Sequence, residues 1–179
     1  RIDRMVRSSL KMPLRGGDMI QPWYREKYGI SKDETGRHTI RLRYSFRAEV
    51  LPETEYRLVM EQSERWEIRV NRKKLEKNVK GHWIDKCFDE IELPRELLKA
   101  GKNTIEMTAE FDAGLNLECA YIIGNFGVGL EGKKTWIRAL PEKLKTGDIT
   151  YQGLPFYSGK ICYHTGICNK RLKVKLEDC

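Results

Sequence analysis

The chain has 179 residues, enough for one domain with a sizeable buried core. Its composition, 40% hydrophobic and 34% charged, is typical of a globular domain, and no apolar run approaches the roughly 20 residues of a membrane-spanning helix. The net charge of +8 is concentrated at one end: residues 1–47 hold 12 basic against 5 acidic side chains, whereas the rest hold 22 against 21. Because a nucleic-acid-binding domain usually carries its positive charge on the folded face that reads the ligand, this distribution argues against nucleic acid as a partner.

Residues 1–37 show no hydrophobic period, and we expect an irregular basic leader that packs on, or links to, a domain formed by residues 38–179. The last strand of that domain either closes it or is shared with a following domain. Alternation begins in "TIRLRYSFRAEV", which predicts a half-buried strand with a polar outer face. The pattern resumes after "LPET" and again in "RWEIRV", and "NRKK" predicts the turn that follows. Trp66 and Phe46 alternate with charged residues, so we expect both rings in the core.

Residues 81–111 predict strands that flank a short helical turn. Pro94 ends a strand and suits the first turn of a helix. Gly101 supplies the left-handed residue that ends the turn, after which "KNTIEMTAEF" alternates again. Further strand candidates are "NLECAYIIG", "KTWIRAL", "KICYHTGI" and "RLKVKL". Many short alternating strands without a long helix predict an all-β fold, an antiparallel two-sheet β-sandwich.

Motifs that suggest catalysis or a nucleotide site have simpler structural explanations. "GVGLEG", residues 127–132, matches the glycine pattern of dinucleotide sites, but strand-like residues follow it where that pattern requires a helix. We therefore expect turn glycines at a sheet edge. Acidic residues fall mostly at outward positions of alternating strands, and no nucleophile motif is present. We predict no catalytic residue and no enzyme activity in this chain.

The cysteines and histidines predict no metal site. The five cysteines form no CxxC pair, and the three histidines lie far apart in sequence. Cys87, Cys119 and Cys162 lie in apolar strand-like segments, where a cysteine behaves as a small buried hydrophobe. No Asp-rich loop argues for a structural calcium ion, and we expect no cofactor. Together with the absence of N-glycosylation sequons, the cysteines favour a reducing, cytoplasmic compartment.

Aromatic residues in turn-rich contexts are the remaining binding candidates. Flat rings on loops can stack on the apolar faces of sugars while polar neighbours reach the hydroxyl groups. The candidates for carbohydrate contact are Trp83, Trp136, Tyr151, Phe156 and Tyr157. Packing in the core or at a corner is the alternative for each of them.

Three regions together resemble a known family. They are "YRLVMEQSERWEIRVNRKKL", "WIDKCFDEIELPRELLKAGKNTIEM", and "LECAYIIGNFGV" with "LKTGDITYQGLPFYSGKICY". Over roughly residues 38–165, the chain resembles the galactose-binding-like jelly-roll domains, also called sugar-binding domains, of large bacterial glycoside hydrolases of family 2 and related families. Three positions depart from the pattern. Arg72 replaces a turn glycine, Asn125 replaces an acidic residue, and Ile149 replaces a tryptophan that would offer a ring for stacking.

The resemblance implies a jelly roll with a non-catalytic, accessory role in a glycoside hydrolase-like parent protein. Its partners would be the catalytic domain of the same parent chain and carbohydrate. It also implies that "QGLPFYSG" is a corner leading into a strand, with Phe156 and Tyr157 clamping the turn onto the sandwich. Two alternatives stay open: a dedicated carbohydrate-binding module, and a catalytic fragment of a glycoside hydrolase.

Overall fold

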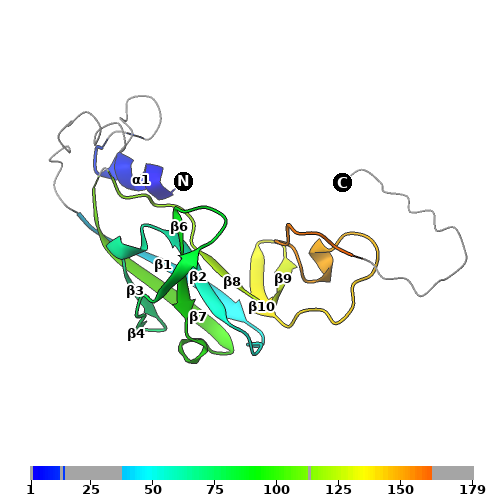
Figure 1. Ribbon diagram of the computed structural model, residues 1–179. Coiled ribbons are helices and arrows are strands. Elements are labelled where there is room, and N and C mark those ends of the chain that lie inside the picture. The colour runs from blue at the N-terminus through cyan, green and yellow to red at the C-terminus, as the bar shows by residue number, and fades with distance from the viewer. Residues whose placement is uncertain (1, 13, 15–37, 113, 163–179) are drawn as a thin grey trace, which may run out of the picture.

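The computed structural model describes residues 2–12, 14, 38–112 and 114–162. Its strands are β1 (His38–Ala48), β2 (Tyr56–Glu61), β3 (Glu67–Val70), β4 (Lys73–Lys74), β5 (Val79–His82), β6 (Phe88–Leu93), β7 (Gly101–Phe111), β8 (Tyr121–Gly124), β9 (Gly127–Glu131) and β10 (Lys134–Arg138). They form a six-stranded sheet in the order β4-β3-β7-β1-β10-β9 and a four-stranded sheet in the order β5-β6-β2-β8 (Figure 1). The prediction of an all-β fold with two sheets is confirmed.

Strands β1 and β7 form the centre of the six-stranded sheet, and both follow the predicted alternation. They pair antiparallel along their full lengths, from His38 opposite Phe111 to Ala48 opposite Gly101. The inward residues of β7 are buried, whereas outward residues carry charge, as in the ion pair of Arg43 with Glu106 at 2.6 Å. Period two therefore separates an apolar face from a solvated one, as the sequence predicted.

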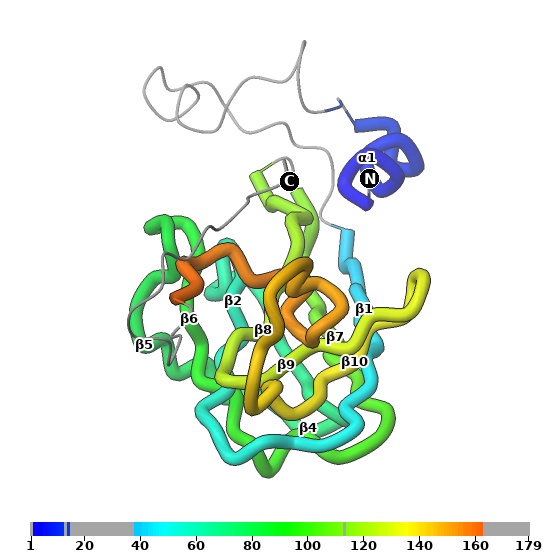
Figure 2. Tube along the Cα trace, turned by 90° about the vertical axis from the view of Figure 1, so that its right-hand side faces the viewer, coloured from blue at the N-terminus to red at the C-terminus, as the bar shows by residue number. Residues whose placement is uncertain are grey.

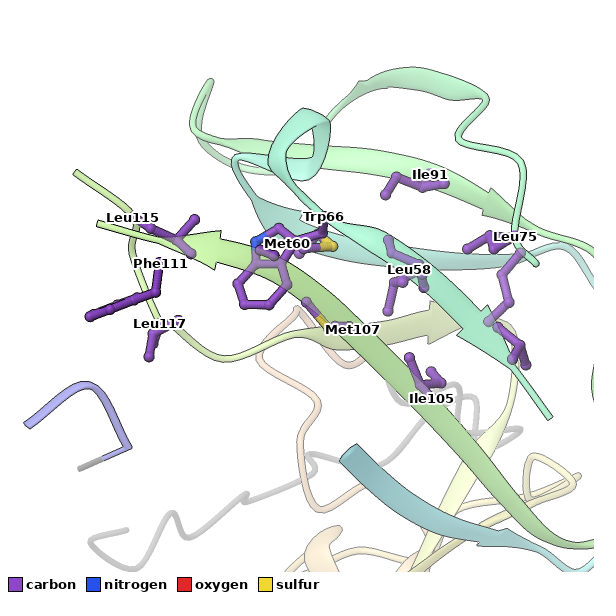
Figure 3. Packing of buried hydrophobic residues seen from close by; sticks show 14 of the residues in the cluster. Leu58, Met60, Trp66, Leu75, Ile91, Ile105, Met107, Phe111, Leu115 and Leu117 are labelled. Atoms are coloured by element: carbon purple, nitrogen blue, oxygen red, sulfur yellow. The ribbon is translucent and has the colours of Figure 1, made fainter. Parts of the chain in front are cut away.

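The core lies between the two sheets (Figure 3). Trp66 follows the short helix η1 (Ser63–Arg65) and is only 2% exposed. It lines a very small cavity with Met60 and Met107, so the ring joins β2 of one sheet to β7 of the other. Phe46 is partly buried and packs against the same cluster. The core prediction is confirmed for Trp66, and Phe46 lies at the edge of the core.

Strand direction departs from the prediction at one place. Strands β1 and β10 pair parallel, with Arg47 opposite Trp136 and Ala48 opposite Ile137. The chain returns from β8 through the antiparallel β9–β10 hairpin, and this route brings β10 alongside β1 in the same direction. Alternation shows which face a residue takes but not the direction of the strand beside it, so the prediction of purely antiparallel sheets was wrong here.

Part of the predicted irregular leader is helical, and residues 1, 13 and 15–37 of it lie outside the described residues. Helix α1 (Ile2–Ser9) carries Val6, and Leu10 follows one turn later; both pack against the core. Arg7 is buried, pairs with Asp3 at 2.9 Å and lies over the ring of Phe111. Spacings of three and four residues connect these contacts, and the helix is too short for that period to stand out in the sequence. Among the described residues, no helix has the length and apolar character needed to cross a bilayer.

Cys87, Cys119 and Cys162 are exposed, so the prediction that they are buried was wrong. The reason is that the strands are shorter than predicted. Cys87 precedes β6, and Cys119 precedes β8, which begins only at Tyr121. Residues 160–162 of "KICYHTGI" form no strand. The rest of that segment and all of "RLKVKL" lie outside the described residues.

Two amide side chains, those of Asn103 and Asn71, hold the turns at one end of the sandwich. Asn103, the last residue of "GKN", is fully buried. Its side chain bonds the backbone N–H and C=O of Lys99, the C=O of Gly101 and the amide of Asn71. Asn71 in turn accepts from the N–H of Thr104 at 3.0 Å. Gly101 has φ +90°, as predicted, and the network ties it to the β3–β4 hairpin.

The hairpin turn itself uses two residues with positive φ. Asn71 has φ +48° and Arg72 has φ +74°. Two consecutive residues of this kind are typical of the tight turns that match the twist of antiparallel strands. An Asn-Gly pair is preferred there, so Arg72 occupies a conformation that favours glycine. Pro94 leads into the short helix η2 (Arg95–Leu97), as predicted.

Candidate functional site

The β9–β10 hairpin and the segment after it form a small lobe at one side of the sandwich (Figure 1). The segment contains the short helix η3 (Thr150–Gln152), which lies next to β9 and β10 (Figure 2). The N–H of Val128 donates to the C=O of Gly153 at 2.7 Å. The side chain of Gln152 bonds both the N–H and the C=O of Lys145. The bond between Val128 and Gly153 therefore fixes the segment to the hairpin, and Gln152 braces the segment internally.

Three of the predicted contact residues extend from this segment into solvent. Tyr151 is 81% exposed, Phe156 is 71% exposed and Tyr157 is 48% exposed. Tyr157 donates from its hydroxyl to the C=O of Lys160 at 2.9 Å and so braces its own loop. The prediction that Phe156 and Tyr157 clamp the corner onto the sandwich was wrong. The buried residue of the corner is Gly153, which leaves the rings free to face water.

Trp136 belongs to the same lobe but lies on the sheet. It is opposite Arg47 in the ladder and therefore on the outer face of the six-stranded sheet. The indole covers Gly129, its partner on β9, so closely that a Cβ at that position would overlap the ring. Its Nε1–H donates to Oε2 of Glu49 at 3.2 Å. The ring is thus held flat against the backbone and is half-buried.

The remaining candidate, Trp83, lies apart from the other four. It follows β5 of the four-stranded sheet and packs against Tyr121, with ring centroids 5.9 Å apart. Phe88 contacts Tyr121 from another side at 6.1 Å. Sequence reasoning missed Tyr121, which is 43% exposed, because it sits in the apolar run "AYIIG" that predicts a buried strand. The structure therefore places Trp136, Tyr151, Phe156 and Tyr157 in the same lobe, whereas Trp83 lies beside the four-stranded sheet.

The carboxyl groups with clearly shifted pKa values are all hydrogen-bonded acceptors. Ion pairing with Lys80 lowers the pKa of Glu92, and the side chain and N–H of Thr150 lower that of Asp148. Hydrogen bonds from the backbone N–H and the thiol of Cys87 lower the pKa of Asp85. Burial raises the pKa of Asp112, but hydrogen bonds from Arg65 and from two backbone N–H groups outweigh this effect and lower the pKa overall. Ionised acceptors of this kind are not general acids, whose pKa must be raised.

A shallow groove of about 490 Å³ opens at the β2–β6 end of the four-stranded sheet. Its cations are paired with acidic residues: Arg57 bonds Glu90 at 2.6 Å, and Lys80 bonds Glu92 at 2.9 Å. These two cations are therefore already satisfied and offer no free positive charge to a ligand. In the part of the chain that the structure describes, no three His, Cys, Asp or Glu side chains gather as a metal site.

Comparison with known proteins adds no relative: no family model, curated protein or solved structure matches the chain. The candidate site is therefore defined by the chemistry of its own residues. It consists of the three exposed loop rings and the indole of Trp136, all carried by the lobe.

Proposed function

We propose that this chain is a non-catalytic accessory domain that binds carbohydrate and accompanies the catalytic domain of a glycoside hydrolase-like parent chain. The observation that carries the proposal is the display of three aromatic rings by one short loop, at Tyr151, Phe156 and Tyr157. Large aromatic side chains are normally buried, and a group of exposed rings marks a binding surface. The sequence resemblance to galactose-binding-like jelly rolls points to the same ligand class and to the finer fold type.

Carbohydrate suits these rings because a sugar presents an apolar face of C–H groups and an edge of hydroxyl groups. The rings offer flat apolar surfaces, and Ser158 and Lys160 lie between or beside them with polar groups exposed. The loop is fixed to the hairpin through Gly153, and Gln152 braces the segment internally by bonding Lys145. A fixed backbone reduces the entropy lost on binding, so even a shallow surface can retain a ligand.

The electrostatics favour binding over hydrolysis. Glycoside hydrolysis requires one carboxylic acid with a raised pKa beside a second carboxylate. The clearly shifted carboxyl groups of the described residues have lowered pKa values, each explained by a local hydrogen bond or ion pair. None of these four groups therefore suits the role of the general acid.

The test is a glycan array followed by calorimetry on the purified chain and a triple variant, Tyr151→Ala, Phe156→Ala and Tyr157→Ala. We expect the chain to bind at least one glycan and the variant to bind that glycan with at least tenfold lower affinity. Tyr121→Ala is the matched control, because it removes an exposed ring from the other sheet. A chain that binds no glycan, or a triple variant that binds as well as the parent, contradicts the proposal. Hydrolysis of a bound glycan that one carboxylate substitution abolishes would replace it with the catalytic alternative.

A further inference from the structure

One row across the outer face of the six-stranded sheet combines an aromatic ring with two cations. Lys102 on β7 is directly opposite Arg47 on β1, and Arg47 is opposite Trp136 on β10. Neighbouring strands lie about 4.8 Å apart, so the three side chains follow one another at intervals of about that length. Gly129 on β9 continues the row and supplies the surface on which the indole rests.

The two cations of this row lack the acidic partner that some other cations of the same face have. Arg43 is neutralised by Glu106, its partner across the β1–β7 ladder. The side chains of Arg47 and Lys102 are exposed and form no hydrogen bond or ion pair with any other described residue. Like charges directly opposite each other in an antiparallel pair are destabilising. Arg47 and Lys102 therefore repel each other, whereas an acidic residue at either position would form an attractive pair.

The indole of Trp136 is oriented by its neighbours before any ligand binds. Gly129 allows it to lie against the strand, and Glu49 accepts its N–H. The carboxylate of Glu49 is thereby directed to the edge of the ring. Arg138, two residues further along β10, is exposed and also forms no ion pair within the described residues. The surroundings of the indole therefore carry excess positive charge.

We propose that this row is a subsite for an anionic sugar, with the ring stacked on Trp136 and its carboxylate or sulfate bound by Arg47. A guanidinium binds either group through two parallel N–H donors. The next anionic group along a polysaccharide would then be within reach of Lys102. The ligand would also offset the repulsion between the two cations. This inference rests on the proposed function and narrows the carbohydrate to an acidic one.

The experiment compares anionic polysaccharides with neutral counterparts of the same backbone. Polygalacturonate is tested against its methyl ester, and dextran sulfate against dextran, by affinity electrophoresis and calorimetry at low and high salt. We expect about tenfold tighter binding to at least one anionic polymer than to its counterpart, and weakening with salt. Whichever anionic polymer binds identifies the group, carboxylate or sulfate. Oligothymidylate is included, and tighter binding to it than to both anionic polysaccharides would overturn the proposal.

Variants then separate the subsite from a general effect of charge. The substitutions Arg47→Gln and Lys102→Gln should each weaken binding of the anionic polymer about tenfold, whereas Arg41→Gln should leave that affinity unchanged. Arg41 is the matched control because it is exposed on the same face of the same strand, six positions away from Arg47. Lys102→Glu should abolish binding and yet raise the unfolding midpoint, since it pairs with Arg47. Trp136→Phe should retain part of the affinity, with circular dichroism confirming the fold.

The outcomes distinguish this inference from the proposed function. If neutral and anionic polymers bind equally well through the loop rings, the anionic subsite is refuted and the carbohydrate-binding role stands. If no anionic polymer binds while a glycan of the array does, only the anionic subsite is refuted; if neither the polymers nor the array shows binding, both are refuted. If Arg41→Gln weakens binding as much as Arg47→Gln does, the effect is one of net charge, and the assigned row is refuted.

Discussion

Replacing Asn103 by alanine should be among the most destabilising changes of a polar residue in this fold. The side chain is fully buried and takes part in four hydrogen bonds with three other residues. Each contributes a net of about 1 kcal/mol, and a buried partner left unpaired adds to the loss. Lys99 lies in an exposed turn and can regain water, so we expect a total loss of about 3 kcal/mol rather than the full sum.

Urea unfolding followed by circular dichroism measures this loss as a shift in midpoint at constant slope. Asn78→Ala is the matched control, because the Asn78 amide makes one exposed side-chain bond, to Glu92 at 2.8 Å, and should change stability by less than about 0.5 kcal/mol. A loss below about 1 kcal/mol for Asn103→Ala would show that the amide network does not hold the two turns together.

Three further predictions concern the backbone and the charges. Gly129→Ala should destabilise the fold by about 1–3 kcal/mol and shift the fluorescence of Trp136 to the red, because the new Cβ displaces the indole; Gly81→Ala, where a Cβ meets nothing, should do neither. Arg72→Gly should stabilise the hairpin by about 1 kcal/mol in thermal unfolding, since glycine accepts φ +74° without strain; a loss would contradict the turn geometry. Asp112→Ala should reduce stability at neutral pH. Because the folded pKa of this carboxyl is lowered, its contribution is present above the unfolded pKa and disappears as pH falls through the folded value, so the difference between the two proteins should vanish in acid.

The sequence predicts the central strands well because their pattern is long and strict. Strands β1 and β7 each alternate over eleven residues, and the core position of Trp66 follows from the same period. Gly101 and Pro94 are local signals whose backbone preferences act whatever the surroundings. These features depend on neighbours in sequence, which the sequence itself displays.

The features that sequence reasoning missed depend on neighbours in space. Pairing of β10 with β1 decides which side chains surround Trp136, and no local pattern records it. Phe156 and Tyr157 are exposed because Gly153 makes the backbone contact that an aromatic clamp would otherwise provide. The candidate rings could be identified by residue type, whereas the row of cations beside Trp136 could be found only from the register of the sheet.

The way the lobe joins the sandwich affects both the order of folding and the local opening of the folded protein. The β9–β10 hairpin is local and can form by itself, but it reaches β1 only through contacts such as that of Glu49 with Trp136, 87 residues apart in sequence. Closing so long a loop is slow, so docking of the hairpin is expected to be a late step. The parallel ladder that secures it is two residue pairs long. Amide protons of β9 and β10 should therefore exchange with solvent faster than those of β7, through an opening that leaves the rest of the molecule intact.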